Sequence, residues 1–383
     1  MAFKAVIAGG GVAGLEATIA LRALAQDAVS IELVSPVPEF TYRPMAVAEP
    51  FGRGRVHRFD LAAVARECGA TLRLAGLERV DASSAQAILD VGATLGYDAL
   101  LIACGTTHAP AVPGADTFRG PADVEMFRKL LVDADTTKVR SLVFIVPHGT
   151  VWPLPLYELA LMTAVRVSRR PPSLTIVTSE EGPLDVLGPA ASRAVSDLLA
   201  EHGIAVQCGA YPIAVKHGRL SLAPTGSVQA DRFVALPLQR GITVPGAPRT
   251  PTGFIPVDEH ARVVGLECVF AAGDITDYPV KQGGVAAQQA DAAAECIAAE
   301  AGAAILPTPF RPVLRTVLLT GDGPRYLSSR LRDGAVSSVA TSQPFWSPAD
   351  KIAAPFLAPF LARAVSEKGA RTQLPGAGNR SVH

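Results

Sequence analysis

Three glycines near the N-terminus have the spacing that phosphate-binding chemistry needs. They occur as Gly9-x-Gly11-x-x-Gly14, after the apolar run Lys4–Ala8 and at the start of a segment with helical character. The first glycine permits a tight turn, the second lets the backbone approach a pyrophosphate, and the third lets the helix pack closely on the strand. Free N–H groups at the helix N-terminus attract the anion. The spacing therefore predicts a dinucleotide site.

Ser35 stands at the ribose-recognition position, about 20 residues further on, where a carboxylate is usual. It follows the β-rich run Ser30–Val34, which completes a strand–helix–strand unit. Glu32 lies in that run, but strand alternation turns its side chain to the opposite face. A serine makes fewer hydrogen bonds to ribose than a carboxylate does, so we expect weaker binding at that end.

A second motif distinguishes FAD from NAD. Val269–Asp274 places an aspartate just after a buried strand, and Lys281-Gln282-Gly283 then precedes a helical segment. Asp274 can accept a hydrogen bond from a ribityl hydroxyl, and the helix after Gly283 offers its N-terminal N–H groups to the flavin. An ordinary strand–turn–helix would explain this segment alone. Paired with the N-terminal glycines, it predicts FAD.

The sequence resembles the FAD-dependent pyridine nucleotide-disulfide oxidoreductase superfamily. Within it, the sulfide:quinone oxidoreductase and flavocytochrome c sulfide dehydrogenase flavoprotein group is the most similar, followed by the type II NADH dehydrogenases. The resemblance extends over roughly residues 1–300 and rests on Gly9, Gly11, Gly14, Tyr97–Gly105, Phe270–Asp274, Phe40–Pro44, Thr252–Asp258 and Lys281–Gly284.

This resemblance implies an α/β fold with two Rossmann-like domains, the second inserted in the first, plus a C-terminal cap. The expected ranges are 1–120 with 235–307 for the FAD domain, 121–234 for the second domain, and 308–383 for the cap or tail. The predicted cofactor-binding residues are Gly9, Gly11, Val12, Ala13, Gly14, Ser35, Pro36, Arg43, Pro44, Val80, Cys104, Gly105, Gly273, Asp274, Lys281 and Gln282.

The second domain lacks the glycine fingerprint that NAD(P)H binding requires. Its first strand leads into Pro147–Pro155, where three prolines remove backbone donors and Trp152 adds bulk. Glu180 and Glu181 favour a nucleotide ribose, although a solvated acidic turn explains them equally well. We expect weak NAD(P)H binding. The catalytic residues stay unknown, with Lys281, His148 and Trp152 as candidates.

The cysteines argue against sulfide oxidation of the usual kind, which needs a thiolate pair beside the flavin. The chain has five, at positions 68, 104, 208, 268 and 296, with no C-x-x-C pair. We place Cys104 near the adenosine end of the cofactor and expect Cys268 and Cys296 to be buried structural thiols. The resemblance places covalent flavin attachment, as in the flavocytochromes, in the loop Pro36–Pro50; this loop contains no cysteine, so the FAD is expected to be non-covalent. No metal site is expected.

Composition excludes other classes of partner. The 35 basic and 35 acidic residues leave no positive excess for nucleic acid. No apolar run is long enough to span a membrane, and the unpaired cysteines fit a cytoplasmic protein. Apolar residues of the tail, Phe345-Trp346 and Phe356–Leu361, favour packing on the FAD domain or a homodimer partner. Peripheral contact with the inner face of a membrane stays open. The last dozen residues are expected to be disordered.

Together these features predict an FAD-dependent oxidoreductase. Electrons would pass from an unidentified small-molecule donor, through non-covalent FAD, to a quinone, oxygen or protein acceptor. One alternative is an NAD(P)H-dependent flavin reductase. A second alternative is a flavoprotein that retains FAD structurally and acts as an interaction partner.

Overall fold

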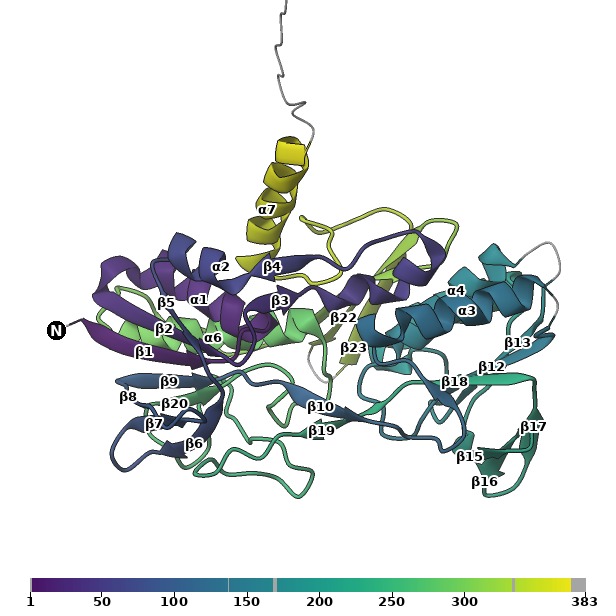
Figure 1. Ribbon diagram of the computed structural model, residues 1–383, viewed down its shortest axis with the longest axis horizontal. Helices are drawn as coiled ribbons and strands as arrows, with labels where there is room; N and C mark the ends of the chain where they lie inside the picture. The colour runs from purple at the N-terminus through teal and green to yellow at the C-terminus, as the bar shows by residue number, and fades with distance from the viewer. Residues whose placement is uncertain (1, 137, 168–170, 333–334, 373–383) are drawn as a thin grey trace, which may run out of the picture.

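Two α/β units lie side by side along the long axis of the protein, and C-terminal elements pack against both (Figure 1). The computed structural model describes residues 2–136, 138–167, 171–332 and 335–372. The chain builds most of the first unit, crosses to the second, and then returns to complete the first sheet with β20. The predicted fold class, two Rossmann-like units with the second inserted in the first, is confirmed.

The first unit is built on a five-stranded parallel sheet, covered on both faces. Its strands, in spatial order, are β20 (Val269–Ala271), β9 (Ala99–Ile102), β1 (Phe3–Ala8), β2 (Val29–Ser35) and β5 (Thr71–Leu74). Helices α1 (Val12–Ala25), α2 (Leu61–Glu67) and α6 (Gly283–Glu300) contribute to the core on one face. An antiparallel meander of β6 (Leu77–Asp81), β7 (Gln86–Leu89) and β8 (Thr94–Gly96) covers the other. Burial on both faces explains the continuous apolar runs of β1 and β9.

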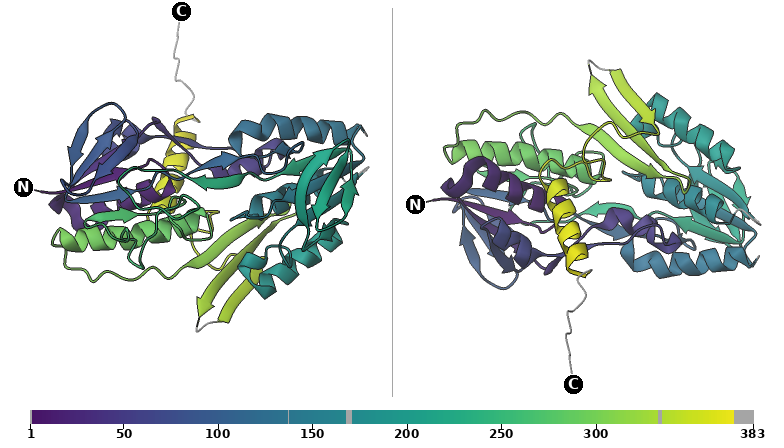
Figure 2. Two further views of the ribbon diagram at one scale, coloured as in Figure 1. Left: turned by 90° about the horizontal axis from the view of Figure 1, so that it is seen from below. Right: turned by 90° about the horizontal axis from the view of Figure 1, so that it is seen from above.

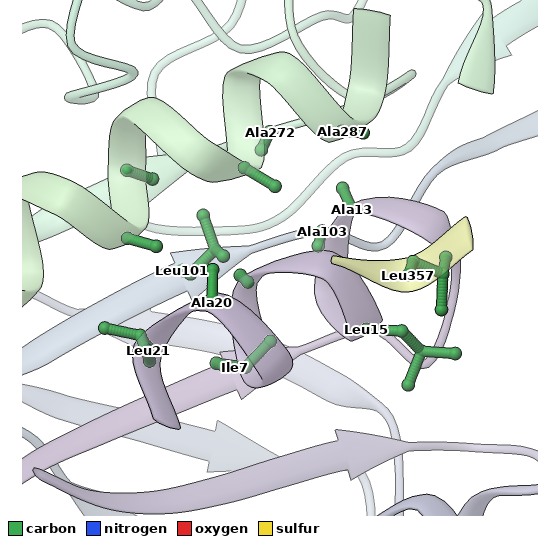
Figure 3. Close-up of a cluster of buried hydrophobic side chains, with 14 of the residues drawn as sticks. Ile7, Ala13, Leu15, Ala20, Leu21, Leu101, Ala103, Ala272, Ala287 and Leu357 are labelled. Carbon is green, nitrogen blue, oxygen red and sulfur yellow. The ribbon is translucent and has the colours of Figure 1, made fainter. Parts of the chain in front are cut away.

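Helices α1 and α6 pack against each other through small side chains. Ala13 and Ala20 of α1 and Ala287 of α6 lie in one buried cluster (Figure 3). Alanines let two helices approach closely, so the first turns of α1 and α6 are held near the same edge of the sheet.

The second unit repeats this plan. Its parallel sheet has the order β11 (Asp116–Thr117), β18 (Arg232–Ala235), β12 (Ser141–Val146), β13 (Ser173–Thr178) and β14 (Ala205–Gln207). One face packs on α3 (Val124–Asp135), α4 (Leu154–Arg166) and α5 (Pro189–Glu201). The other packs on a meander of β15 (Tyr211–Lys216), β16 (Arg219–Ala223) and β17 (Ser227–Gln229). The exact boundaries of the second domain, 121–234, stay a proposal because β11 and the last residue of β18 lie just outside them.

Two short antiparallel ribbons lie outside these sheets. β10 (Thr106–Ala109) pairs antiparallel with β19 (Leu238–Gly241), and this ribbon connects the two units (Figure 1). β3 (Glu39–Thr41) pairs with β4 (Arg58–Asp60) in the first unit.

The C-terminal region adds a sheet and a helix. β21 (Val313–Leu319), β22 (Pro324–Arg332) and β23 (Ala335–Thr341) form an antiparallel sheet beside α5, and α7 (Leu357–Thr372) stands out from the first unit (Figure 2). Leu357, Phe360 and Leu361 are buried in the first core, whereas Phe345 is exposed. The prediction of disorder concerns a tail that lies largely outside the described residues. No helix within the described ranges is both long and apolar enough to cross a membrane.

A buried carboxylate holds the start of α7. Glu16 of α1 is fully buried and accepts hydrogen bonds from the backbone N–H groups of Phe356 (3.0 Å) and Leu357 (2.6 Å). Asp291 of α6 shares a hydrogen bond with Glu16, and burial, followed by the charge on Glu16, raises the pKa of Asp291 to about 8. Burial raises the pKa of Glu16 as well, against the hydrogen bonds that it accepts, and Asp291 keeps its proton at neutral pH and donates it to Glu16.

We predict that this pair makes the protein less stable as the pH rises. Folded Asp291 retains its proton up to about pH 8, whereas the carboxyl of the unfolded chain loses it near pH 4. The stability that this proton supplies is complete below pH 4 and is lost as the pH rises through about 8. Asp291→Asn should flatten this part of the dependence, since the amide can donate to Glu16 without titrating. Urea midpoints between pH 6 and pH 9 test this, with the exposed Glu78→Gln as a control that should keep the wild-type slope. An unchanged slope in Asp291→Asn would contradict it.

Candidate functional site: a cleft between two helix N-termini

A cleft of about 940 Å³ opens at the carboxyl ends of the first sheet's strands. In open parallel sheets ligands bind at this edge. The cleft reaches from Gly9–Ala13 in the first unit to Thr150–Trp152 and Glu158 in the second. Both units and the connecting ribbon therefore contribute to one site.

The glycines of the first motif serve different physical needs. Gly9 has a φ of +137°, and a Cβ there would lie 2.1 Å from the carbonyl oxygen of Ala103. A Cβ on Gly14 would lie 1.8 Å from the carbonyl oxygen of Gly9. Gly11 lines the cleft, and a Cβ there would meet no described atom within 4 Å. The fold thus requires Gly9 and Gly14, whereas Gly11 keeps space open at the start of α1.

The two helix N-termini meet at Gly273. This residue follows β20 with a φ of +83°, and a Cβ on it would lie 3.1 Å from Cβ of Ala13 and 3.4 Å from Cβ of Ala286. It is thus packed between the first turns of α1 and α6. First-turn N–H groups without helical acceptors carry a positive partial charge, so the cleft is suited to an anionic ligand.

The Asp274 carboxylate has no hydrogen-bond donor among the described residues, and it lines the cleft. Burial raises the pKa of Asp274, while the charges of Lys281 and Arg43 oppose that shift. Asp274 is half-buried, and a partly desolvated carboxylate without a donor would gain from a ligand hydroxyl that donates to it.

Lys281 and Gln282 already hold the backbone around the cleft. The Lys281 ammonium donates to the carbonyl oxygens of Thr276 and, at 2.6 Å, Tyr278, and burial lowers its pKa to about 8. Gln282 caps α6, because its Oε1 accepts from the N–H of Val285 at 2.9 Å. Both residues line the cleft, and their side chains position the turn that leads into α6.

Ser35 and Glu32 differ in their relation to the cleft. The Ser35 hydroxyl lines the cleft and donates to the carbonyl oxygen of Val37 at 2.8 Å. Glu32 is paired with Arg73 at 2.8 Å and with Lys4 at 3.3 Å, away from the cleft. The alternation expected for β2 is therefore observed.

Most of the residues predicted from sequence come together in this one cleft. Those that line it are Gly9, Gly11, Val12, Ala13, Ser35, Pro36, Arg43, Pro44, Cys104, Gly105, Trp152, Gly273, Asp274, Lys281 and Gln282. Three others lie elsewhere. Gly14 packs beneath Gly9, Val80 is buried on β6 with its N–H donating to the carbonyl oxygen of Pro245, and His148 is exposed beside the ring of Tyr211.

Known proteins share this fold. No family model matches the sequence. The sulfide:quinone oxidoreductase of Aquifex aeolicus superposes with a TM-score of 0.81 at 20% identity, over 96% of this chain and 90% of that one. A ferredoxin reductase of Rhodopseudomonas palustris gives 0.64 at 17% identity, over 86% and 82%. The chain has the pyridine nucleotide-disulfide oxidoreductase fold. The fold implied by the sequence resemblance is thus confirmed.

Sequence similarity points to oxidoreductases as well. An NADH dehydrogenase-like protein of Mycobacterium tuberculosis is 27% identical over 300 residues, which is 71% of this chain and 72% of that protein. Fold and sequence agree with the prediction of a flavin-dependent oxidoreductase, and neither specifies a reaction.

The cysteines give this oxidoreductase fold no dithiol at the cleft. Cys104 is the only cysteine that lines it among the described residues. Its thiol lies 3.4 Å from the carbonyl oxygen of Ala8, and burial raises its pKa to about 11, so it is not a thiolate at neutral pH. Cys296 is buried, as predicted, but the prediction for Cys268 is wrong. Cys268 precedes β20 in the left-handed region, at a φ of +58°, and is exposed.

Glu180 of the second unit is hydrogen-bonded to neighbouring side chains. Glu180 follows β13 and accepts hydrogen bonds from the hydroxyls of Tyr157 (2.6 Å) and Thr178 (2.8 Å). Burial raises the pKa of Glu180 to about 7. Its second oxygen, Oε1, is buried without a partner in the described chain. Glu180 is thus half-buried, and its Oε2 is occupied by the two hydroxyls and not by a ribose.

A second cavity, of about 460 Å³, lies beside α7. Its lining is mostly apolar and includes Met45, Phe59, Val317, Leu357, Leu361 and Val365. Lys351 and Ile352 line both this cavity and the main cleft, so they separate the two. Lys351 forms a buried ion pair with Glu158 of α4, at 2.6 Å.

Sequence reasoning missed this ion pair and part of the cleft. Glu158 and Lys351 are 193 positions apart, so nothing local to either residue signals the contact. Arg119 and Gln239 also line the cleft without belonging to a motif. The sequence offered one signal for this ion pair, namely Glu158, a glutamate within a largely apolar helical segment.

We predict different stability effects for two similar glycine substitutions. Gly14→Ala should lower the free energy of unfolding by about 1–3 kcal/mol, because its methyl group would overlap the Gly9 carbonyl. Gly11→Ala should leave the free energy of unfolding of the cofactor-free protein near that of wild type, because nothing occupies that space. Chemical denaturation of both variants measures this. Equal destabilisation by the two substitutions would show that Gly11 also has a packing role.

Proposed function

We propose that this protein binds FAD non-covalently in the main cleft and works as an electron-transferring oxidoreductase. One observation supports this above all others: two helix N-termini and the unpartnered Asp274 carboxylate share a single cleft. The pyrophosphate would bind at Gly9–Ala13, and a ribityl hydroxyl would donate to Asp274. When bound, FAD supplies reversible electron transfer.

The protein's own side chains position and shield this site. Ile352 packs on the start of α6, since a Cβ on Gly283 would lie 2.9 Å from its Cγ1. Gln282 fixes the same turn by capping α6 and by donating to the carbonyl oxygen of Arg315 at 2.9 Å. Lys281 adds positive charge next to Asp274. The cysteines support non-covalent attachment, because Cys104 is the one cysteine of the described chain that lines the cleft and its thiol, with a pKa raised to about 11, is protonated at neutral pH.

We further propose a quinone as the electron acceptor. The second cavity has a mostly apolar lining, although Arg55, His57 and Asp350 also line it; it adjoins the main cleft and is closed on one side by α7. An apolar ring compound would gain burial there and lie next to the wall formed by Lys351 and Ile352. Oxygen needs no such cavity, and a protein acceptor would dock on an outer surface.

NAD(P)H is the alternative electron donor, favoured by the similarity to NADH dehydrogenase-like proteins. Two features of this chain oppose it. The segment that leads into α4 lacks donors at Pro147 and Pro153, and at Pro155 in the first turn of the helix; one oxygen of the Glu180 carboxylate is occupied by the hydroxyls of Tyr157 and Thr178. We therefore favour a different donor.

We predict that the purified protein is yellow and releases intact FAD on denaturation by heat or acid. Asp274→Ala should weaken FAD retention by about 1–3 kcal/mol, the cost of a lost hydrogen bond to a charged group. The measurement is the flavin spectrum and chromatography of the released cofactor. The matched control is the exposed Asp277→Ala, which should retain wild-type flavin content. A colourless protein that cannot be reconstituted would refute the function, whereas full occupancy in Asp274→Ala would refute only the ribityl position.

We also predict that neither NADH nor sulfide reduces the flavin efficiently. NADH should bind in the millimolar range or more weakly, which corresponds to about 4 kcal/mol. Reduction should be slow compared with a typical turnover of about 10 per second. Millimolar sulfide should leave the anaerobic spectrum oxidised over seconds, because no cysteine pair faces the cleft. Stopped-flow absorbance tests both donors. Micromolar NADH affinity with rapid bleaching would move the protein to the NADH-dependent alternative.

A further inference from the structure

The ribbon that connects the two units directs two polar side chains into the main cleft. His108 of β10 and Gln239 of β19 are direct cross-strand partners. Paired residues project from the same face of a ribbon, and side chains alternate along each strand. Thr106, His108 and Gln239 accordingly line the cleft, whereas their neighbours Thr107 and Arg240 do not.

Gln239 has an unfilled hydrogen-bonding position. Its Oε1 is buried and has no partner in the described chain. A buried amide oxygen without a donor costs free energy comparable to a lost hydrogen bond. Because this oxygen faces a cleft, a ligand hydroxyl or N–H group would fill the position.

The charges that act on His108 are positive. Burial lowers its pKa, and the guanidinium groups of Arg43 and Arg119 lower it further. His108 is thus a neutral imidazole at pH 7, with one donor and one acceptor nitrogen. Arg119 is also paired with Asp123, at 2.7 Å, so Arg43 and the Arg119 N–H groups that Asp123 leaves free are what favour an anionic group beside His108.

The facing wall belongs to the second unit. Thr150 and Trp152 line the cleft from the loop before α4, and the Thr150 hydroxyl is engaged with the carbonyl oxygen of Pro147 at 2.7 Å. Trp152 therefore offers mainly an apolar surface opposite the polar ribbon. A small ligand fits this combination better than a dinucleotide, which would need backbone donors from that loop.

We propose that His108, Gln239 and Arg119 form a binding subsite for a small hydroxycarboxylate. Its hydroxyl donates to Gln239 Oε1, and its carboxylate lies in the positive field of Arg119 and Arg43. The subsite rests on the proposed function, since such a ligand would be the electron donor: its alcohol carbon would be oxidised to a ketone, and the two electrons and two protons released would reduce the bound FAD to FADH2. The binding claim itself concerns only residues of this chain.

The test compares two probes that differ by one hydroxyl group, lactate and propionate. Calorimetric titration of the flavin-loaded protein should show lactate binding about tenfold more tightly, and only lactate should perturb the flavin spectrum strongly. Gln239→Met should remove the preference for lactate. It should also leave the melting temperature unchanged or higher, because it deletes an unpartnered buried oxygen.

Arg240→Gln is the matched control. It removes a positive charge from the same ribbon, but on the face turned away from the cleft, so both affinities should stay at wild-type values. Arg119→Gln should weaken lactate and propionate alike. Three results would overturn the subsite. They are equal affinities for lactate and propionate in the wild type, no detectable lactate binding at millimolar concentrations, and a preserved preference for lactate in Gln239→Met. A colourless protein would instead refute the proposed flavin function, and calorimetry on that preparation would still decide the subsite.

Discussion

Close packing of α1 against α6 is the constraint on which the rest of the structure depends. Small residues at the contact, with Gly273 between Ala13 and Ala286, bring two helix N-termini to the same point. A larger residue at Gly14 or Gly273 would separate the helices from the sheet. The cleft, its positive partial charge and the position of Asp274 all follow from this close approach.

The C-terminal region is attached to the two units by two buried carboxylates, one in each unit. Glu16 of α1 binds the start of α7, and Glu158 of α4 binds Lys351. Between these anchors, Ile352 covers the start of α6 and separates the cleft from the apolar cavity. The C-terminal region is thus part of the site, although it lies outside every motif.

The two units show how one architecture can support different uses. Each has a parallel sheet with helices on one face and a meander on the other. In the first unit the loop after the leading strand keeps an open glycine, Gly11. In the second, the equivalent loop carries prolines and Trp152, and the acidic Glu180 is bonded to Tyr157. The second unit therefore contributes a wall to the cleft in place of a nucleotide site.

Sequence alone predicts the features that depend on neighbouring residues. The strand–glycine–helix motif and the strand before Asp274 are local patterns, and both lead to the cleft. Contacts between distant segments had no such signal, as the Glu16–Leu357 and Glu158–Lys351 contacts show. His148 was a plausible loop histidine, yet the loop directs it to Tyr211. Gln239 could be identified as a residue of the cleft only from its pairing with His108 across the ribbon.

The most direct test of the account is a titration of the cofactor-free protein with FAD and with ADP, which carries the pyrophosphate without the ribityl and flavin groups. We expect both to bind, FAD more tightly. Gly11→Ala should weaken both ligands, because the added methyl group stands where the pyrophosphate approaches α1. Asp274→Ala should weaken FAD and leave ADP unchanged. Equal loss of ADP affinity in Asp274→Ala, or unaltered binding of both ligands to Gly11→Ala, would contradict the placement of the cofactor between the two helix N-termini.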